Sequence, residues 1–354
     1  MTRQQAEGWS PHDFDFELPT AQIAQSPSER REQARLLVAG DPCQHLRFGD
    51  VRSVLPEGAL VVLNDSRVVP ARLFFERQGD ARMFELLWCE PSPSVTPGQE
   101  IRAWVRGAKK MRVGDRLMCG GASVAYVRAD EIDPRARVFR VESGDLFEVA
   151  TSQGSMPLPP YIARPEGTTD EDKRRYQTVY ARPPGSVAAP TAGLHFTEDL
   201  LAQIPHTFVT LHVGPGTFLP MEAEDVREHR VGTERFSVSE ETAAQIESAR
   251  ASARPVIAVG TTTTRALESV AKRSGGRVVP GSFDTDLVIT PGFDFQVIDG
   301  LLTNFHLPRS SLLMLVCSLG GVAQVLAGYQ EAVREGYRFY SYGDAMFVPR
   351  VRMI

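Results

Sequence analysis

The pattern of apolar and polar positions changes twice along this chain, near residue 74 and near residue 155. The run ALVVL at 59–63 is continuously apolar and ends in turn-forming polar residues, which is typical of a buried strand. Beyond residue 155, strand candidates alternate with helix candidates, which indicates an α/β arrangement. The strand candidates cover 208–214, 255–261 and 287–290, and the helix candidates cover 239–250, 263–273 and 310–336.

The segment between these two regions has a different pattern of apolar and polar residues. Its short alternating runs are separated by Gly, Pro and Asp, which is typical of a small antiparallel barrel or sandwich. These runs are 83–89, 100–106, 116–120, 122–128 and 137–143. We therefore predict a discontinuous α/β main domain, residues 1–73 and 155–354, with a small antiparallel β-barrel domain, residues 74–154, inserted into it.

Composition narrows the class of protein. A chain of 354 residues suggests about two domains, and a net charge of −5 argues against a wholly basic nucleic-acid binder but leaves room for one basic face. The 4 cysteines stand singly, so we expect no disulfide framework, no structural zinc site and a cytoplasmic location. The N-terminus lacks the apolar core of a signal peptide, and the apolar run 311–325 is too short and too Gly-interrupted to span a bilayer.

Four histidines stand in or beside turns: His195, His212, His229 and His306. Several such loops can converge on one pocket, although a satisfied buried imidazole is the alternative for each histidine taken alone. Because no pair shows the i,i+4 or HExxH spacing of zinc ligands, we predict no metal site.

The stretch GTTTTR, residues 260–265, follows an apolar strand candidate and opens a helix candidate. Threonine side chains and free helix amides there can hold an anion, and Arg265 can clamp a carboxylate. The alternative is helix capping by threonine. Neither a Walker loop nor a GxGxxG fingerprint is present, so the usual nucleotide-binding argument does not apply.

Three further loops carry candidate residues. Asn64 and Asp65 follow a buried strand, where α/β sites tend to lie, and the alternative for them is turn formation. Gly216 in GPGTF lets a flat ligand approach the backbone, unless the loop is a plain β-turn. Asp344 in SYGDAMFV suits a ligand or general-base role, with an ordinary Asp turn as the alternative.

These segments together resemble one family, the S-adenosylmethionine:tRNA ribosyltransferase-isomerases of queuosine biosynthesis. The resemblance follows family order along nearly the whole chain and is loose only in the central β region. Its most specific motifs are YQTVYARPPGSVAAPTAGLHFTEDLL and TNFHLP, and NDSRVVPAR, VTLHVGPGTF, VIAVGTTTTRALES and YRFYSYGDAM support them. Two positions depart from the family pattern: Gly232 replaces the second His of H-x-M-H-x-E, and Leu219 replaces a common Arg.

The resemblance implies an activity and its substrates. S-adenosylmethionine would serve as co-substrate, with no permanently bound cofactor, and would donate its ribosyl part to 7-aminomethyl-7-deazaguanine in tRNA. The ribose would rearrange to an epoxycyclopentane-diol, adenine and methionine would leave, and epoxyqueuosine would form at the anticodon wobble position. We also expect a monomer that does not associate with a membrane.

The resemblance also implies roles for particular residues. We expect small residues of AAPTAGLHF to let a planar base lie against the backbone while His195 points at the reacting atoms. The candidate proton carriers are His195, His212, His306, Glu234 and Asp344. The candidate substrate-binding residues are Asn64, Asp65, Arg67, Arg72, Thr191, Gly193, Gly216, Thr261, Thr262, Arg265, Asn304 and Tyr342.

A tRNA partner requires local cations on an acidic chain. The candidates are Arg30, Arg31, Arg35, the hairpin 109–116 and residues 173–175, although a solvated hairpin is the alternative for 109–116. We expect the target base to leave its stack to reach the pocket. Two other functions stay open: an ordinary methyltransferase, whose Gly-rich loop is not evident, and a catalytically silent RNA-binding module, whose aromatic repeats and basic balance are not clear.

Overall fold

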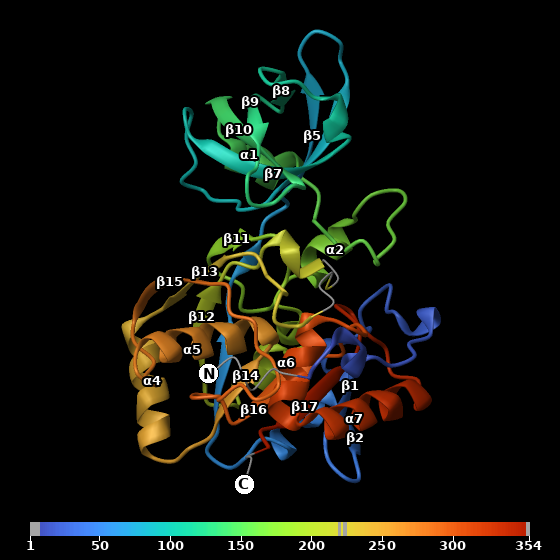
Figure 1. Cartoon of the computed structure of the whole chain (residues 1–354), viewed down its shortest axis with the longest axis vertical. Coiled ribbons are helices and arrows are strands. Elements are labelled where there is room, and N and C mark those ends of the chain that lie inside the picture. Colours follow the sequence, from blue (N-terminus) through green and yellow to red (C-terminus); the bar gives the residue numbers. More distant parts are fainter. Residues whose placement is uncertain (1–7, 219–220, 222–224, 352–354) are drawn as a thin grey trace.

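The computed structural model describes residues 8–218, 221 and 225–351, and places them in a large mixed sheet with helices and in a separate antiparallel sheet (Figure 1). The strands of the large sheet follow one another in the order β15-β13-β12-β3-β14-β16-β17-β1-β2. Their bounds are β15 Gly281–Thr285, β13 Glu234–Val238, β12 His206–Leu211, β3 Leu60–Asn64, β14 Val256–Val259, β16 Gly300–Asn304, β17 Ala345–Pro349, β1 Arg35–Val38 and β2 Gln44–Arg47.

Strand directions bring many chain segments to one edge of this sheet. β12, β3, β14 and β16 run parallel, whereas β17 runs antiparallel to β16 and pairs in parallel with β1. The carboxyl end of β16 therefore lies beside the amino ends of β17 and β1, with both Asn304 and Leu36 opposite Ala345. We call this edge, where β12, β3, β14 and β16 end and β17 and β1 begin, the site edge.

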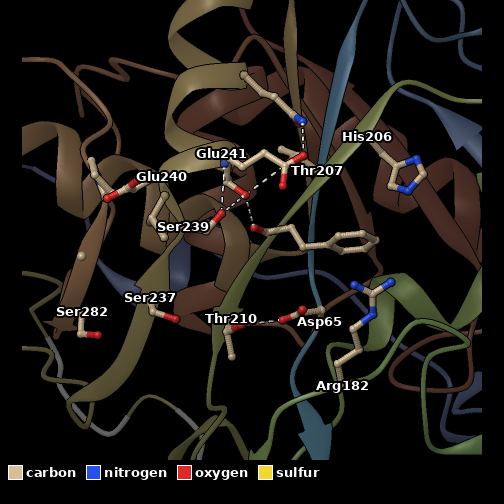
Figure 2. Close-up of a pocket in the computed structure, with 16 residues that line it drawn as sticks. Asp65, Arg182, His206, Thr207, Thr210, Ser237, Ser239, Glu240, Glu241 and Ser282 are labelled. Carbon is tan, nitrogen blue, oxygen red and sulfur yellow. Dashed lines mark hydrogen bonds between the residues drawn. The ribbon is translucent and has the colours of Figure 1, made fainter.

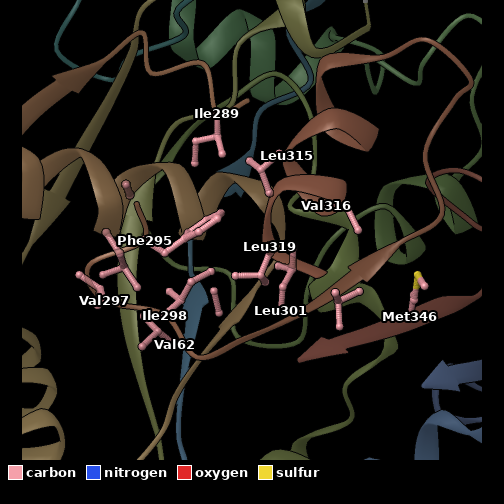
Figure 3. Packing of buried hydrophobic residues seen from close by; sticks show 14 of the residues in the cluster. Val62, Ile289, Phe295, Val297, Ile298, Leu301, Leu315, Val316, Leu319 and Met346 are labelled. Atoms are coloured by element: carbon pink, nitrogen blue, oxygen red, sulfur yellow. The ribbon is translucent and has the colours of Figure 1, made fainter. Parts of the chain in front are cut away.

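Alternating residues of β3 serve two cores. Leu60 and Val62 belong to the core under α4 (Glu240–Ala251), α5 (Thr261–Arg273), α6 (Ser311–Gly320) and α7 (Val322–Arg334). Figure 3 shows part of this core, in which Leu301 of β16 lies near Leu319 of α6 and Val62 of β3 belongs to the same cluster. On the opposite face, Val61 and Leu63 pack with η5 (Phe48–Ser53), η7 (Thr191–His195) and α3 (Glu198–Leu201). Both faces of the central strands are thus covered, which explains the unbroken apolar run.

The second sheet occupies the upper part of Figure 1 and has its own core. Its strands pair in the cyclic order β10-β7-β6-β5-β8-β9, since β10 pairs with both β7 and β9. They are β5 Arg72–Arg77, β6 Met83–Trp88, β7 Glu100–Arg106, β8 Arg116–Cys119, β9 Ala122–Ala129 and β10 Ala136–Ser143, followed by α1 Leu146–Gln153. Between the two sheets lie α2 (Asp170–Arg175) and the strand pair β4 (Arg67–Val68) and β11 (Pro184–Ser186).

The predicted mixed α/β fold with a separate antiparallel β region is confirmed, and two predicted elements are wrong. Residues 287–290 form no strand; the neighbouring strand is β15. The helix predicted over 310–336 is divided into α6 and α7, which meet at a bend of 117°. The division falls at Gly321, whose φ of +80° lies outside the helical region. No single helix of the described residues has the length and apolarity to cross a membrane, although the bent pair of α6 and α7 passes on those two criteria.

Candidate active site

Segments that are distant in sequence deliver polar side chains to the site edge. Asn64 ends β3, Asn304 ends β16, and His212 directly follows β12. Gly260 links β14 to α5, and Asp344 immediately precedes β17. Because parallel strands end at the same edge, the sequence motifs that contain these residues come together there.

His195 is held against the end of β16. Its Nε2 atom lies 3.2 Å from Asn304 Nδ2, and its ring centroid lies 4.9 Å from that of Phe48. The Asn304 amide also donates to the Tyr340 carbonyl at 3.1 Å. Burial, assisted by the charges of Arg338 and Arg31, lowers the pKa of His195 to about 3. The imidazole is therefore neutral at pH 7.

A small cavity of about 20 Å³, room for about one water molecule, lies beside His195. Tyr342 contributes to its wall, and the buried Tyr342 hydroxyl makes no hydrogen bond within the described part of the chain. The remaining lining residues are Pro27, Ser28, Arg31, Arg175, Leu194, Ser341 and Gly343.

Arg31 is a cavity residue that sequence reasoning assigned only to phosphate contact. Its guanidinium donates to the carbonyls of Leu194 at 2.8 Å and Gln177 at 2.9 Å. Burial and the neighbouring Arg175 lower the pKa of Arg31 from its usual value. Arg31 therefore fixes the backbone that leads to His195.

Asp344 is buried, and its carboxylate accepts hydrogen bonds from two segments of backbone. One carboxylate oxygen accepts from the Arg35 amide and the other from the Arg338 amide, both at 2.8 Å. The guanidinium of Arg338 lies 3.8 Å from the same carboxylate. Asp344 thus joins the start of β1 to the turn before β17, and its carboxylate is already engaged at both oxygens.

His306 is partly buried in the turn after β16. Its Nε2 atom lies 2.9 Å from Thr303 Oγ1, and its backbone amide donates to the Tyr329 hydroxyl at 3.0 Å. Burial lowers the pKa of His306 to about 3. This imidazole is also neutral at pH 7.

A second cluster surrounds Arg265, one turn into α5. Its Nη1 lies 2.5 Å from Glu234 Oε2, and its Nε donates to the Leu287 carbonyl at 2.9 Å. Glu234 Oε1 also accepts from the Gly214 amide at 3.2 Å. Within the described ranges, Arg265 Nη2 and His229 Nε2 are buried without a hydrogen-bond partner. Burial, Arg230 and Arg265 lower the pKa of His229.

Asn64 and Asp65 point to different surroundings. The buried Asn64 amide exchanges two hydrogen bonds with the Leu211 backbone, at 2.9 and 3.0 Å, and its Nδ2 lies 3.5 Å from Thr262 Oγ1. It therefore ties β3 to β12 next to the start of α5. Asp65 accepts from Thr210 Oγ1 at 2.6 Å, and burial raises the pKa of its carboxyl.

A polar groove of about 740 Å³ lies beside Asp65 (Figure 2). Arg182, Phe208 and Thr210 line it, and the Arg182 guanidinium carbon lies 5.5 Å from the centre of the Phe208 ring. The groove follows the face of β12 and β13 up to the first turn of α4. Asp65 is the one predicted site residue among its lining side chains.

The remaining loop residues differ in their packing. His212 packs on Gly185, where a Cβ would meet the imidazole ring, and burial lowers its pKa. Gly193 lies in η7 and packs on Tyr180. Thr191, at the start of η7, is partly buried. Gly216 is exposed in η8 (Pro215–Phe218), and a Cβ there would meet nothing within 4 Å of the described atoms.

Some predicted positions are not brought into these clusters. Arg72 lies in β5, where it donates to the Leu158 carbonyl at 3.2 Å and pairs with Glu85 at 3.6 Å. Arg67 is exposed in β4 and donates to the Ala181 carbonyl at 2.7 Å. Leu219 lies outside the described residues, whereas Gly232 is exposed. In the part of the chain that the structure describes, no three His, Cys, Asp or Glu side chains are grouped as metal ligands.

Comparison with known proteins decides the family. The family model described as queuosine biosynthesis protein matches residues 11–348. This chain belongs to the queuosine biosynthesis protein family. The match spans both sheets and every candidate residue of the site edge.

Relatives within the queuosine biosynthesis family are similar over almost the full chain. An S-adenosylmethionine:tRNA ribosyltransferase-isomerase from Anaeromyxobacter dehalogenans (strain 2CP-C) is 47% identical over 348 residues, 96% of this chain and 99% of that protein. One of the same name from Desulforamulus reducens is 43% identical over 345 residues, 95% of this chain and 98% of that protein. The crystal structure of an S-adenosylmethionine tRNA ribosyltransferase from Thermotoga maritima is 30% identical, with a TM-score of 0.51, and covers 95% of this chain and 99% of that one.

Proposed function

We propose that this chain is an S-adenosylmethionine:tRNA ribosyltransferase-isomerase. It transfers the ribosyl part of S-adenosylmethionine to 7-aminomethyl-7-deazaguanine in tRNA and isomerises it, giving epoxyqueuosine and releasing adenine and methionine. The observation that carries the proposal is the near full-length identity to relatives of that name. The meeting of the family motifs at the site edge supports it, since a single reaction needs those residues in one place.

The proposed chemistry asks for groups that hold the co-substrate and control protons. Departing adenine needs a donor at its ring, and loss of a C5′ hydrogen beside the sulfonium needs a base. His195, His212, His306 and Glu234 are the proposed proton carriers among the clustered side chains. Asp344 joins them with a restricted role, because both of its oxygens already accept backbone hydrogen bonds.

Arg265 and the start of α5 are the proposed holders of the methionine carboxylate. Within the described residues the Arg265 Nη2 atom is buried and unpaired, so it can donate to a bound carboxylate without breaking the link to Glu234. Thr261 and Thr262 lie in the first turn of α5, where free backbone amides favour an anion. The other proposed substrate-binding residues are Asn64, Asp65, Arg67, Thr191, Gly193, Gly216, Asn304 and Tyr342, with Arg72 the one that the fold supports least.

Two features of organisation belong to the same proposal. Residues 74–154 form an inserted barrel domain, and residues 1–73 with 155–354 form the main domain. The cyclic pairing of the six strands β5 to β10 supports this division, although β5 already begins at Arg72. The chain acts as a monomer in the cytoplasm, where its tRNA substrate is found, and uses S-adenosylmethionine as a co-substrate without a permanently bound cofactor.

Exposed cations of the segment 109–116 are the proposed contacts to tRNA phosphates. The hairpin predicted there is wrong: the segment holds the short helix η6 (Ala108–Lys110) and a turn into β8, and β7 and β8 pair with other strands. Lys109, Lys110 and Arg112 are exposed there. Arg30 is also exposed but pairs with Glu32 at 2.6 Å. Arg31 and Arg35 are less suited, because their guanidinium groups already donate to backbone carbonyls.

One incubation tests the activity. The protein, S-adenosylmethionine and tRNA that carries the deazaguanine precursor are combined, and the small molecules and the modified nucleoside are identified by mass spectrometry. We expect equal amounts of adenine and methionine, with the nucleoside mass of epoxyqueuosine. S-adenosylhomocysteine would instead indicate a methyltransferase, and tRNA binding without any product would indicate an RNA-binding module.

A further inference from the structure

Two contacts of Asn304 determine which atom of its side-chain amide is the nitrogen. The atom that faces the Tyr340 carbonyl lies 3.1 Å from it. A carbonyl oxygen only accepts hydrogen bonds, so the Asn304 atom there must be the donating nitrogen. The same nitrogen lies 3.2 Å from His195 Nε2. An NH₂ group has two hydrogens, one for each contact.

The contact with Asn304 in turn fixes the proton on the imidazole. Nε2 of His195 must accept the second amide hydrogen and so carries no proton of its own. A neutral imidazole then has its proton on Nδ1. Burial among Phe48 and the cations Arg31 and Arg338 favours the neutral ring.

We propose that Asn304 is a positioning residue that holds His195 as the Nδ1–H tautomer, so that the imidazole gives the site a hydrogen-bond donor and not a base. His195 lines the small cavity at the site edge, and the hydrogen bond found for its ring among the described residues is made through Nε2. Nδ1–H is thus the group left for a ligand. Asn304 Oδ1, which is buried without a partner in the described ranges, is an acceptor in the same cluster.

The tautomer changes the role of His195 in the reaction. This part of the inference rests on the proposed function. An N–H donor stabilises negative charge that develops on departing adenine, and it does so without giving up its proton. It cannot remove a hydrogen from C5′ while Nε2 is occupied by Asn304. The base must then be another group of the site edge.

The tautomer is measured directly in the free protein. Protein labelled with ¹⁵N in histidine is studied at pH 7 by long-range ¹H–¹⁵N correlation, and the His195 signal is recognised by its loss in His195→Gln. We expect the Nδ1–H pattern in the wild-type protein. An Nε2–H pattern or an imidazolium pattern overturns the proposal, whatever any variant does.

Asn304→Asp tests the cause of the tautomer. A carboxylate at this place accepts and cannot donate, so His195 should change to Nε2–H or to the imidazolium. Retention of Nδ1–H in the folded variant overturns the assignment of Asn304. Thr303→Val is the matched control on the same strand: it removes the hydroxyl beside His306 and should shift the His306 signal while leaving that of His195 unchanged.

Kinetic measurements test whether the His195 tautomer matters for the reaction. In Asn304→Asp we expect kcat for adenine release to fall about 10²- to 10³-fold, the usual loss for one donor aimed at developing charge, with a small change in the KM for S-adenosylmethionine. An unchanged kcat in a variant whose tautomer has switched overturns the donor role. If the wild-type protein shows Nδ1–H but releases no adenine, the proposed function fails and the tautomer assignment stands.

Discussion

Arg265 of α5 and Glu234 of β13 form an ion pair with 2.5 Å between Nη1 and Oε2, and both residues are buried. The pair joins a helix that follows one parallel strand to a strand near the edge of the sheet. It also fixes two loops, because Glu234 accepts from the Gly214 amide and Arg265 donates to the Leu287 carbonyl. Both charges are thus held by hydrogen bonds that a single substitution would break.

Glu234→Ala should lower the free energy of unfolding by about 3–5 kcal/mol, because it leaves the Arg265 guanidinium buried without its counter-charge. The double variant Glu234→Ala/Arg265→Leu should lose less than the sum of the single losses. Urea unfolding followed by circular dichroism measures the free energy of unfolding of the single variants and of the double variant. Arg334→Ala, at a guanidinium that is 69% exposed and pairs with Glu331, is the control and should change stability by less than about 1 kcal/mol. A Glu234→Ala loss as small as the control's would mean that the pair is solvated.

The depressed pKa of His195 makes stability depend on pH. Its folded-state pKa of about 3 lies below the usual 6.5, so between these values the unfolded chain binds a proton that the folded chain does not. The contribution of His195 to the free energy of unfolding is fully present above about pH 6.5. It decreases by about 1.4 kcal/mol per pH unit as the pH falls toward 3. Urea unfolding at pH 6 and pH 5 should show a smaller difference for His195→Gln than for the wild-type protein. An equal difference in both would mean that His195 titrates normally when folded.

Gly193→Ala should destabilise η7 and displace His195, because a Cβ at this position would overlap the Tyr180 hydroxyl. Overpacking of this kind costs about 1–3 kcal/mol. Tyr180→Phe removes the nearest obstructing atom, so Gly193→Ala/Tyr180→Phe should recover part of the stability and of the activity. Gly232→Ala, at an exposed position where a Cβ would meet nothing within 4 Å of the described atoms, is the control. Thermal unfolding and adenine release are the measurements, and full tolerance of Gly193→Ala would contradict the packing.

The sequence predicted the parts of the fold whose pattern is local. The apolar run at 59–63 forms β3, and the helix candidates at 239–250 and 263–273 form α4 and α5. The helix over 310–336 was predicted too long, because its pattern continues across Gly320 and Gly321. Gly321 has a φ of +80° and ends α6, and Gly320 packs so closely on Val348 and Val325 that a Cβ would overlap them. Residues 287–290 have strand-forming side chains but lie in an irregular segment whose Leu287 carbonyl accepts from Arg265. Tertiary contacts overrode local preference in both places.

The meeting of motifs at the site edge depends on strand order, which no local pattern contains. Asn304 lies beside His195 only because β16 is inserted between β14 and β17 and because η7 packs at its end. Asp344 was predicted as a candidate base from its small neighbours, yet the structure surrounds its carboxylate with backbone amides. Pairings across the fold decide whether a polar residue is free for a ligand or already satisfied.

Affinity for tRNA should fall steeply with salt, because binding of cationic side chains to phosphates releases counterions. Replacing Lys109, Lys110 and Arg112 with Gln should weaken binding and reduce the slope of log K against log salt concentration by about one for each phosphate that is no longer neutralised. Fluorescence anisotropy with labelled tRNA at several salt concentrations gives the slope. Arg334→Gln on α7 is the control, since its guanidinium pairs with Glu331 and Glu335. A wild-type slope near zero would contradict electrostatic binding, and an unchanged slope in the triple variant would place the tRNA on another surface.

Asp344→Asn separates a structural role of this residue from a catalytic one. Each carboxylate oxygen accepts a backbone hydrogen bond, so an asparagine must turn its NH₂ group toward an amide donor and leave that amide unsatisfied. An unsatisfied buried donor costs about 1–3 kcal/mol, which should appear in urea unfolding. If the carboxylate serves only to hold β1 and the turn before β17, kcat should fall less than about ten-fold once the variant is assayed well below its unfolding midpoint. A proton carrier at this position would instead lose about 10²- to 10⁴-fold in kcat with stability little changed. The two measurements on one purified variant therefore distinguish the roles. Unchanged stability with a large loss of kcat would mean that Asp344 takes part in the reaction as a proton carrier.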